Sequence, residues 1–329
     1  MKARSSNFSN VPLPEESNDR GVWNAQAFQG VGTILASTFK KLLTLKARFS
    51  NFSNVLLPEE RNDMILRNVQ AFQGAGTILA SYPRSGSIWL RSLLYDYVTL
   101  CAGGSITPDP PADLHFFSPR IELPTFTEYL ARPQYDWKII TTHLRLEALQ
   151  DVAHNKHWVV LFRNPVDALV SAFNKRTSPV HKTVWRDKKG QAVWRQQILE
   201  RGIDGFCLDR IEHWTLHAMS FRNAYDENPK AFCFVAYESL HRAPCRTLNN
   251  VLRFGGFTPN EAWINQAVEN RALHKVKSKA RTPKRRNNFG TGQVGSGEND
   301  LKPETLAQMD RLTGSLLARL QEAERLTRV

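Results

Sequence analysis

The fold of this chain is decided by residues 77–89, which read Thr77-Ile78-Leu79-Ala80-Ser81-Tyr82-Pro83-Arg84-Ser85-Gly86-Ser87-Ile88-Trp89. Residues 77–80 form a short apolar run of the length expected for a buried strand. Pro83 and Gly86 then predict a tight turn. Apolar residues follow at helical spacing, and Gly103 and Gly104 predict the end of that helix. The stretch therefore predicts a strand, a tight turn and a helix.

The same alternation continues along the chain. Further strands are predicted at residues 137–141, 158–162 and 231–237, and helices at residues 166–173, 244–254 and 301–326. Strands that alternate with helices indicate a parallel sheet. We therefore expect an α/β fold, with a P-loop-like parallel β-sheet flanked by helices on both faces. Ligands bind such sheets at the carboxyl ends of the strands, where the turns lie.

The first turn has the composition of an anion cradle. Gly86 lets the backbone approach a ligand, and the helix that follows presents free N–H groups and the positive end of its dipole. Ser85 and Ser87 add hydroxyl donors, and Arg84 adds a cation. The standard nucleoside-triphosphate loop, Gly-x-x-x-x-Gly-Lys-Ser/Thr, is absent. A plain strand-to-helix connection is the alternative interpretation.

A second turn follows the predicted strand at residues 158–162. Arg163 stands at the end of this strand, and Ser171 lies about two helical turns further on. An arginine and a hydroxyl so placed can hold one phosphate group. The alternative is that Arg163 pairs with Asp167 in a salt bridge at the start of the helix.

His143 follows the predicted strand at residues 137–141. It is therefore expected at the same edge of the sheet as the two turns. An imidazole with an ordinary pKa near 6.5 suits proton abstraction. The alternative for a lone histidine is a polar surface residue without a role.

Together, the first turn, Thr142-His143-Leu144 and the segment from Arg163-Asn164-Pro165 to Ser171 resemble the sulfotransferase family, which uses 3′-phosphoadenosine 5′-phosphosulfate. The turn at 82–89 is similar to that family's 5′-phosphosulfate loop, and the Arg163 segment to its 3′-phosphate motif. Residues 234–238, Phe-Val-Ala-Tyr-Glu, resemble its Tyr-Glu-Asp segment. The resemblance covers about residues 75–325.

The resemblance implies transfer of a sulfuryl group from this donor to a hydroxyl or amine of a small-molecule acceptor. It implies no metal. His143 corresponds to the catalytic base, and Arg84 stabilises charge on the departing phosphate. The implied donor-binding residues are Arg84, Ser85, Gly86, Ser87, Ile88, Trp89, Arg163, Ser171 and Gly292.

The chain departs from the family pattern at several site positions. Arg84 replaces the usual loop lysine, Thr141 replaces a lysine two residues before the histidine, and Ile88 replaces a hydroxyl donor. Residues 290–297 match the glycine spacing of the family's Arg-Lys-Gly-x-x-Gly motif but lack its two cations. A nucleotide- or phosphate-binding protein of the same fold without transfer activity is therefore the main alternative function. A phosphotransferase is less well supported.

The front of the chain contains a duplication. Residues 3–37 recur at 47–81 with 26 identities in 35 positions. Only the second copy continues into a turn that contains glycine and proline. We therefore expect residues 1–70 to be an N-terminal extension and residues 71–329 to form the sulfotransferase domain.

Charge and composition limit the partners. The net charge of the 329 residues is +13, and residues 271–286 alone hold eight Lys or Arg and no acid. No aromatic residue interleaves this segment, so a platform for single-stranded nucleic acid is poorly supported. No run of about 18 apolar residues occurs, and no secretory signal pattern opens the chain. We expect a cytoplasmic protein with four reduced cysteines, bound to neither nucleic acid nor membrane.

The acceptor cannot be named from the sequence. Its binding loops are expected within residues 108–135 and 178–206. The aromatic residues there are Phe116, Phe117, Phe126, Tyr129, Trp185 and Trp194. They line an acceptor pocket in one interpretation and belong to the core in the other.

Overall fold

The computed structural model describes residue 68 and residues 76–106, 114–123, 126–130, 139–149, 156–178, 188–272 and 292–327. All of them lie in one compact unit, Glu59–Val329. Four parallel strands form the sheet in the order β2-β1-β3-β4. Their bounds are β1 Thr77–Ser81, β2 Ile139–Thr142, β3 His157–Phe162 and β4 Phe232–Ala236. The predicted α/β fold with a parallel sheet is confirmed.

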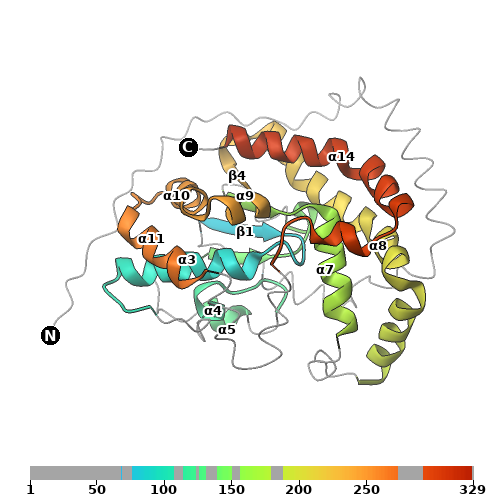
Figure 1. Ribbon diagram of the computed structural model, residues 1–329. Coiled ribbons are helices and arrows are strands. Elements are labelled where there is room, and N and C mark those ends of the chain that lie inside the picture. Colours follow the sequence, from blue (N-terminus) through green and yellow to red (C-terminus); the bar gives the residue numbers. More distant parts are fainter. Residues whose placement is uncertain are drawn as a thin grey trace. The chain divides into compact units, whose positions relative to one another are not determined.

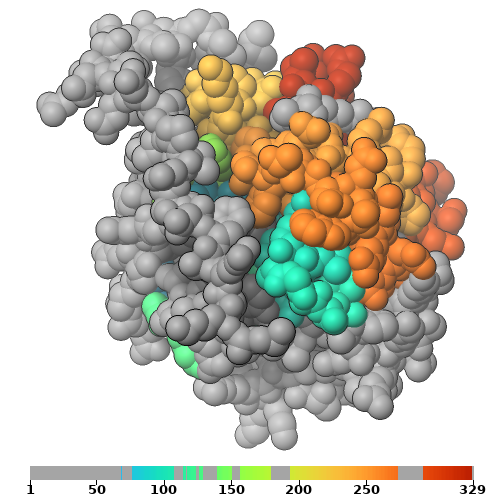
Figure 2. All heavy atoms as spheres, turned by 90° about the vertical axis from the view of Figure 1, so that its left-hand side faces the viewer, coloured from blue at the N-terminus to red at the C-terminus, as the bar shows by residue number. Residues whose placement is uncertain are grey.

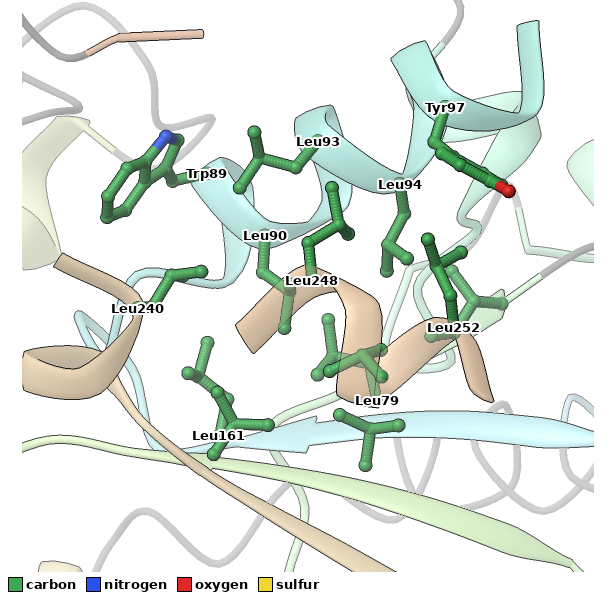
Figure 3. Packing of buried hydrophobic residues seen from close by; sticks show 14 of the residues in the cluster. Leu79, Trp89, Leu90, Leu93, Leu94, Tyr97, Leu161, Leu240, Leu248 and Leu252 are labelled. Atoms are coloured by element: carbon green, nitrogen blue, oxygen red, sulfur yellow. The ribbon is translucent and has the colours of Figure 1, made fainter. Parts of the chain in front are cut away.

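One face of the sheet carries the larger core. Side chains of alternate strand residues point to the same face, and Leu79, Val159, Leu161 and Val235 all belong to one buried cluster. Helices α3 (Ser87–Cys101), α9 (Tyr237–Arg242), α10 (Pro244–Phe254) and α11 (Glu261–Asn270) cover it. Figure 3 shows the leucines of α3 and α10 packed above β1 and β3. This packing fixes the first turn of α3 against the sheet.

The opposite face packs on the long helices. Trp158 contacts Phe221 at a ring distance of 5.6 Å, and Phe234 contacts Tyr225 at 5.5 Å. Both partners belong to α8 (Lys188–Glu227), which bends at Gly202, and α14 (Pro303–Leu326) packs beside it. In Figure 1, α14 and α3 lie on opposite sides of β1. Helices therefore flank both faces of the sheet.

The remaining helices are short, apart from α7 (Pro165–Thr177). The short α-helices are α4 (Leu114–Phe117) and α5 (Phe126–Leu130). The 3-10 helices are η2 (Leu146–Leu149), η4 (Pro229–Ala231) and η5 (Ser296–Asp300). The predicted helix at 244–254 is confirmed at both ends, whereas α8 and α11 had not been predicted.

A buried ion pair joins α11 to α3. Arg271 donates to Asp96 at 2.5 Å, and both side chains are almost fully buried. Asn270 also donates to Asp96, at 2.7 Å, and the Trp89 indole donates to the Arg271 carbonyl at 3.0 Å. Figure 2 shows the orange surface of α10 and α11 against the turquoise surface around the end of α3. Arg271 is thus structural, while the rest of the basic segment, residues 273–286, lies outside the described residues.

The duplication also lies largely outside the described residues. Of the second copy, the structure describes Asn68 and residues 76–81. Asn68 is buried and donates to the carbonyls of Ile121 and Leu123 at 2.8 and 3.0 Å. All four cysteines are free, as expected.

Candidate functional site

The first turn, residues 82–86, is bent by two residues with left-handed backbone. Arg84 has φ 74° and Gly86 has φ 96°. A left-handed arginine is uncommon, and such residues cluster at functional sites. Gly86 also has no room for a side chain, because a Cβ there would lie 2.5 Å from the Tyr237 ring. The aromatic ring therefore holds the turn against the start of α9.

Several hydrogen-bond donors of the turn have no acceptor in the part of the protein that the structure describes. Gly86 is the N-cap of α3, and no side chain caps this helix. Within the described residues, no backbone carbonyl accepts the N–H groups of Gly86, Ser87 or Ile88. The Ser85 hydroxyl is fully buried and has no hydrogen-bond partner among the described residues. Buried donors of this kind require a partner, and an anion at the helix N-terminus supplies one.

Arg163 closes the second turn. Its guanidinium lies 4.3 Å from the centre of the Tyr237 ring and forms an ion pair of 3.3 Å with Asp167. It also donates to the carbonyls of Arg84 at 3.4 Å and Gln293 at 3.1 Å. The salt bridge left open as the alternative is therefore present. The Arg163 Nε is buried and has no hydrogen-bond partner among the described residues, so one donor remains for a ligand.

Asp167 ties the C-terminal loop to this turn. Its carboxylate accepts the N–H groups of Gly295 at 2.8 Å and Gly297 at 2.9 Å. A Cβ on Gly297 would lie 3.0 Å from the same carboxylate, which explains the glycine. The Gly292 carbonyl accepts a bond of 3.4 Å from the Tyr237 hydroxyl. The loop that carries Gly292 is thus held beside Arg163.

Arg84 and Ser171 connect the two turns. The Arg84 Nε donates to the Ser171 hydroxyl at 3.0 Å. Burial, followed by the charges of Arg163 and Arg176, lowers the Arg84 pKa to about 10, so the group remains charged at neutral pH. Lys175 lies one helical turn beyond Ser171 on α7. Burial and the nearby charges of Arg84, Arg120 and Arg176 lower its pKa to about 8.

His143 lies directly against the first turn. Its Nδ1 is 2.6 Å from the Ser81 carbonyl and 3.2 Å from the Ser81 hydroxyl. Burial, followed by the charge of Arg120, lowers the His143 pKa to about 4, and the charge of Glu122 acts in the opposite direction. The imidazole is therefore neutral at physiological pH and able to accept a proton.

Two residues beside His143 had not been singled out from the sequence. Glu122 is a buried carboxylate that accepts the His143 N–H. His217 of α8 lies with its ring 5.8 Å from that of Tyr82, and burial lowers its pKa to about 3. No sequence spacing relates either residue to the predicted motifs, because each reaches the site through tertiary packing.

The other predicted donor-binding residues of the first turn are Ser87, Ile88 and Trp89. Trp89 is 7% exposed and packs edge-on against Tyr237 and His241. The Ile88 side chain packs on the same core cluster. Ser87 occupies the first turn of α3 beside Gly86. The structure therefore brings the residues of both turns, His143 and the Gly292 loop to one edge of the sheet.

The expected acceptor loops need one correction. Residues 188–206 are part of α8 and do not form a loop. Phe117 and Phe126 are fully buried and belong to the core. Trp194 packs beside α7, with Arg176 5.6 Å from its ring centre. Trp185 lies outside the described residues, as do the side chains of Phe116 and Tyr129.

The described part of the chain contains no group of three or more His, Cys, Asp or Glu side chains arranged to hold a metal ion. It also contains no helix that is both long and apolar enough to cross a membrane.

Comparison with known proteins gives a consistent result. The profile of the sulfotransferase domain matches residues 76–321. Cytosolic sulfotransferase 10 of Arabidopsis thaliana is 25% identical over 265 residues, which cover 70% of this chain and 75% of the relative. Flavonol 3-sulfotransferase of Flaveria bidentis is 24% identical over 258 residues, covering 70% of this chain and 78% of the relative.

The fold also resembles a solved structure. Mouse sulfotransferase SULT7A1, crystallised with PAP, superposes with a TM-score of 0.56 at 22% identity. The match covers 80% of this chain and 92% of the mouse chain. At this identity the likeness supports the shared fold.

Proposed function

We propose that His143 is the general base of a sulfuryl transfer. The premise is that this chain belongs to the sulfotransferase domain family. The donor is 3′-phosphoadenosine 5′-phosphosulfate, and the acceptor is a hydroxyl or an amine on a small molecule. The observation that carries the proposal is the contact of 2.6 Å between the His143 Nδ1 and the Ser81 carbonyl. It places an imidazole at the turn that is expected to bind the phosphosulfate.

This contact determines which nitrogen can act as the base. A carbonyl oxygen only accepts hydrogen bonds, so the Nδ1 of His143 carries the proton. The lone pair then resides on Nε2. A neutral imidazole in this tautomer is ready to accept the acceptor's proton.

The reaction balances with these groups alone. The acceptor oxygen or nitrogen attacks the sulfur, and the bond from sulfur to the 5′-phosphate oxygen breaks. The proton of the acceptor passes to the His143 Nε2, and 3′,5′-adenosine bisphosphate leaves. Arg84 and the N–H groups at the start of α3 stabilise the charge that grows on the departing oxygen.

The donors left without partners fit this nucleotide. The Ser85 hydroxyl and the N–H groups of Gly86 to Ile88 support binding of the 5′-phosphate. The Arg163 Nε and the Ser171 hydroxyl support binding of the 3′-phosphate. Like the bound PAP named for the mouse protein, the expected product carries both phosphates.

A nucleotide-binding protein without transfer activity stays the second candidate. The observation in its favour is Thr141, which replaces a family lysine and contacts the Ser118 hydroxyl at 2.6 Å inside the protein. Lys175 supports the first candidate, because it brings another cation close to Arg84 and Arg120.

The test is a comparison of His143→Ala with the wild type. A labelled donor is assayed against a panel of phenols, alcohols and amines, and calorimetry measures binding of 3′,5′-adenosine bisphosphate. Loss of a general base lowers turnover by about 10²–10⁴-fold, with nucleotide binding retained. Full activity in the variant would exclude His143 as the base. Nucleotide binding by the wild type without transfer to any acceptor would favour the second candidate.

Two organisational points belong to the same proposal. Residues 71–329 form the transferase domain, in keeping with a family match that begins at residue 76, and residues 1–70 form the extension. The protein acts in the cytoplasm, as the names of its Arabidopsis relatives suggest for those proteins.

A further inference from the structure

We propose that Glu122 is a positioning residue for His143: its buried carboxylate fixes the histidine backbone and supplies the negative charge that lets the ring accept a proton. The inference rests on the proposed role of His143. It concerns a residue that no sequence motif selects.

The position of Glu122 follows from an extension of the sheet. Residues 119–121 run beside β2, with Thr141 donating to the Pro119 carbonyl at 2.9 Å and Ile121 donating to the Thr141 carbonyl at 3.1 Å. Arg120 and Thr141 form a parallel bridge. Two residues further along both segments, this register places Glu122 beside His143.

The carboxylate of Glu122 holds the end of β2. Its Oε1 accepts the His143 N–H and, at 3.1 Å, the Thr142 hydroxyl. Its Oε2 accepts from the Arg120 Nε at 3.2 Å. A carboxylate with three donors is strongly oriented. The two bonds of Asn68 to the carbonyls of Ile121 and Leu123 hold the backbone on either side of it.

Glu122 is also a negative side chain near the positive side chains of Arg91 and Arg120. The charged and titratable groups that act on His143 are Arg91 of α3, Arg120, Glu122 and His217 of α8, and the Ser81 carbonyl accepts from its ring. Among these, Glu122 alone is negative. Its charge raises the His143 pKa against the effects of burial and of Arg120. Among the described residues, Glu122 is therefore the counter-ion beside the imidazolium that forms during transfer.

The matched control lies at the other edge of the sheet. Glu324 is also buried, and it accepts the Ala236 N–H and the Ser239 hydroxyl, each at 3.1 Å. Both carboxylates accept a backbone N–H and a hydroxyl, and Glu122 also accepts from Arg120; Glu324 lies beside β4 and Glu122 beside β2. The two substitutions to glutamine remove the same charge and differ in their distance from His143.

The experiment measures three quantities for Glu122→Gln and Glu324→Gln. They are turnover with the best acceptor of the panel, binding of 3′,5′-adenosine bisphosphate by calorimetry, and the His143 imidazole pKa by NMR titration. We expect Glu122→Gln to lower kcat about tenfold to a hundredfold, the range for small misplacement of a catalytic group. Its nucleotide affinity stays unchanged, and its His143 pKa falls below the wild-type value. Glu324→Gln changes neither kcat nor that pKa.

A second variant keeps the test valid if Glu122→Gln does not fold. Arg120 is partly exposed, with its side chain at 35%, and Arg120→Gln is expected to raise the His143 pKa. An unchanged pKa in every variant that folds would overturn the proposal. If His143→Ala is inactive and Glu122→Gln fully active, the base assignment stands and the role of Glu122 is wrong. If His143→Ala is active, the proposed function fails first.

Discussion

The turn after β1 and the turn after β3 are similar in sequence and different in use. Both follow a buried strand, contain a proline and start a helix. The first has no side-chain cap, and its N–H groups at Gly86 have no acceptor within the described ranges. In the second, the Asn164 side chain caps Val166 at 2.9 Å, and Asp167 accepts two N–H groups of the C-terminal loop. The first turn can therefore bind an anion through its backbone, whereas the second acts through Arg163 and holds a loop in place.

The largest effect is expected where the first turn cannot tolerate a side chain. Gly86→Ala puts a Cβ 2.5 Å from the Tyr237 ring at a φ of 96°. We expect the affinity for 3′,5′-adenosine bisphosphate, measured by calorimetry, to fall more than about a hundredfold, because such strain costs on the order of 1–3 kcal/mol before any ligand contact is lost. Gly256→Ala is the control, since its φ is 83° and no atom lies within 4 Å of its Cβ. Equal losses in both variants would mean that backbone strain alone, and not the turn, is responsible.

The next effect tests the second turn by comparing the affinities for two ligands, one with and one without a 3′-phosphate. Arg163→Ala is expected to weaken binding of 3′,5′-adenosine bisphosphate about tenfold to a hundredfold, because a charge-assisted hydrogen bond contributes roughly 1.5–3 kcal/mol. Binding of adenosine 5′-phosphate changes far less, since that ligand lacks the 3′-phosphate. Calorimetry with both ligands measures the difference. The same loss for both ligands would mean that Arg163 stabilises the C-terminal loop and Asp167 and does not bind the 3′-phosphate.

A smaller effect tests the loop-holding role of the second turn. Asp167→Asn removes a buried charge that pairs with Arg163 and accepts the N–H groups of Gly295 and Gly297. We expect the free energy of unfolding in urea to fall by about 2 kcal/mol. Asp209→Asn, which breaks the partly exposed pair with Arg201, is expected to cost less than about 1 kcal/mol. A loss no greater than that of Asp209→Asn would show that the loop is held by other contacts.

The smallest effect concerns the charge of Lys175, which lies on α7, the helix of the second turn, and acts near Arg84 of the first turn. Lys175 has its pKa lowered to about 8 and lies near Arg84. Its charge is present below pH 8 and is lost as the pH rises through 8, so wild-type kcat is expected to decline over that interval. Lys175→Met should lower kcat a few-fold at pH 7 and remove the decline. Lys230→Met, at an exposed position, is the control. If kcat of Lys175→Met declines with pH as the wild-type kcat does, the decline belongs to another titrating group.

The candidate site was predictable wherever its residues follow directly from a strand. Arg84, His143 and Arg163 each stand within a few residues of a strand end, and parallel strands bring those ends together. Residues 188–206 were wrongly expected to form a loop, because Gly190, Gly202 and Gly205 interrupt the helical pattern there. The helix forms nevertheless, because it packs against α7 and α14.

The sequence by itself determined the four strands, the helices α3, α7, α10 and α14, and the chemical types at the two turns, because those follow from hydrophobic spacing and from turn residues close together in the chain. Tertiary structure decided which of these groups meet. The bond from Arg84 to Ser171 and the contact of His143 with Ser81 each join residues more than sixty positions apart. The bond from Glu122 to His143 depends on how residues 119–121 align with β2. No local pattern encodes that register, because it is set by burial and by the hydrogen bonds of neighbouring segments.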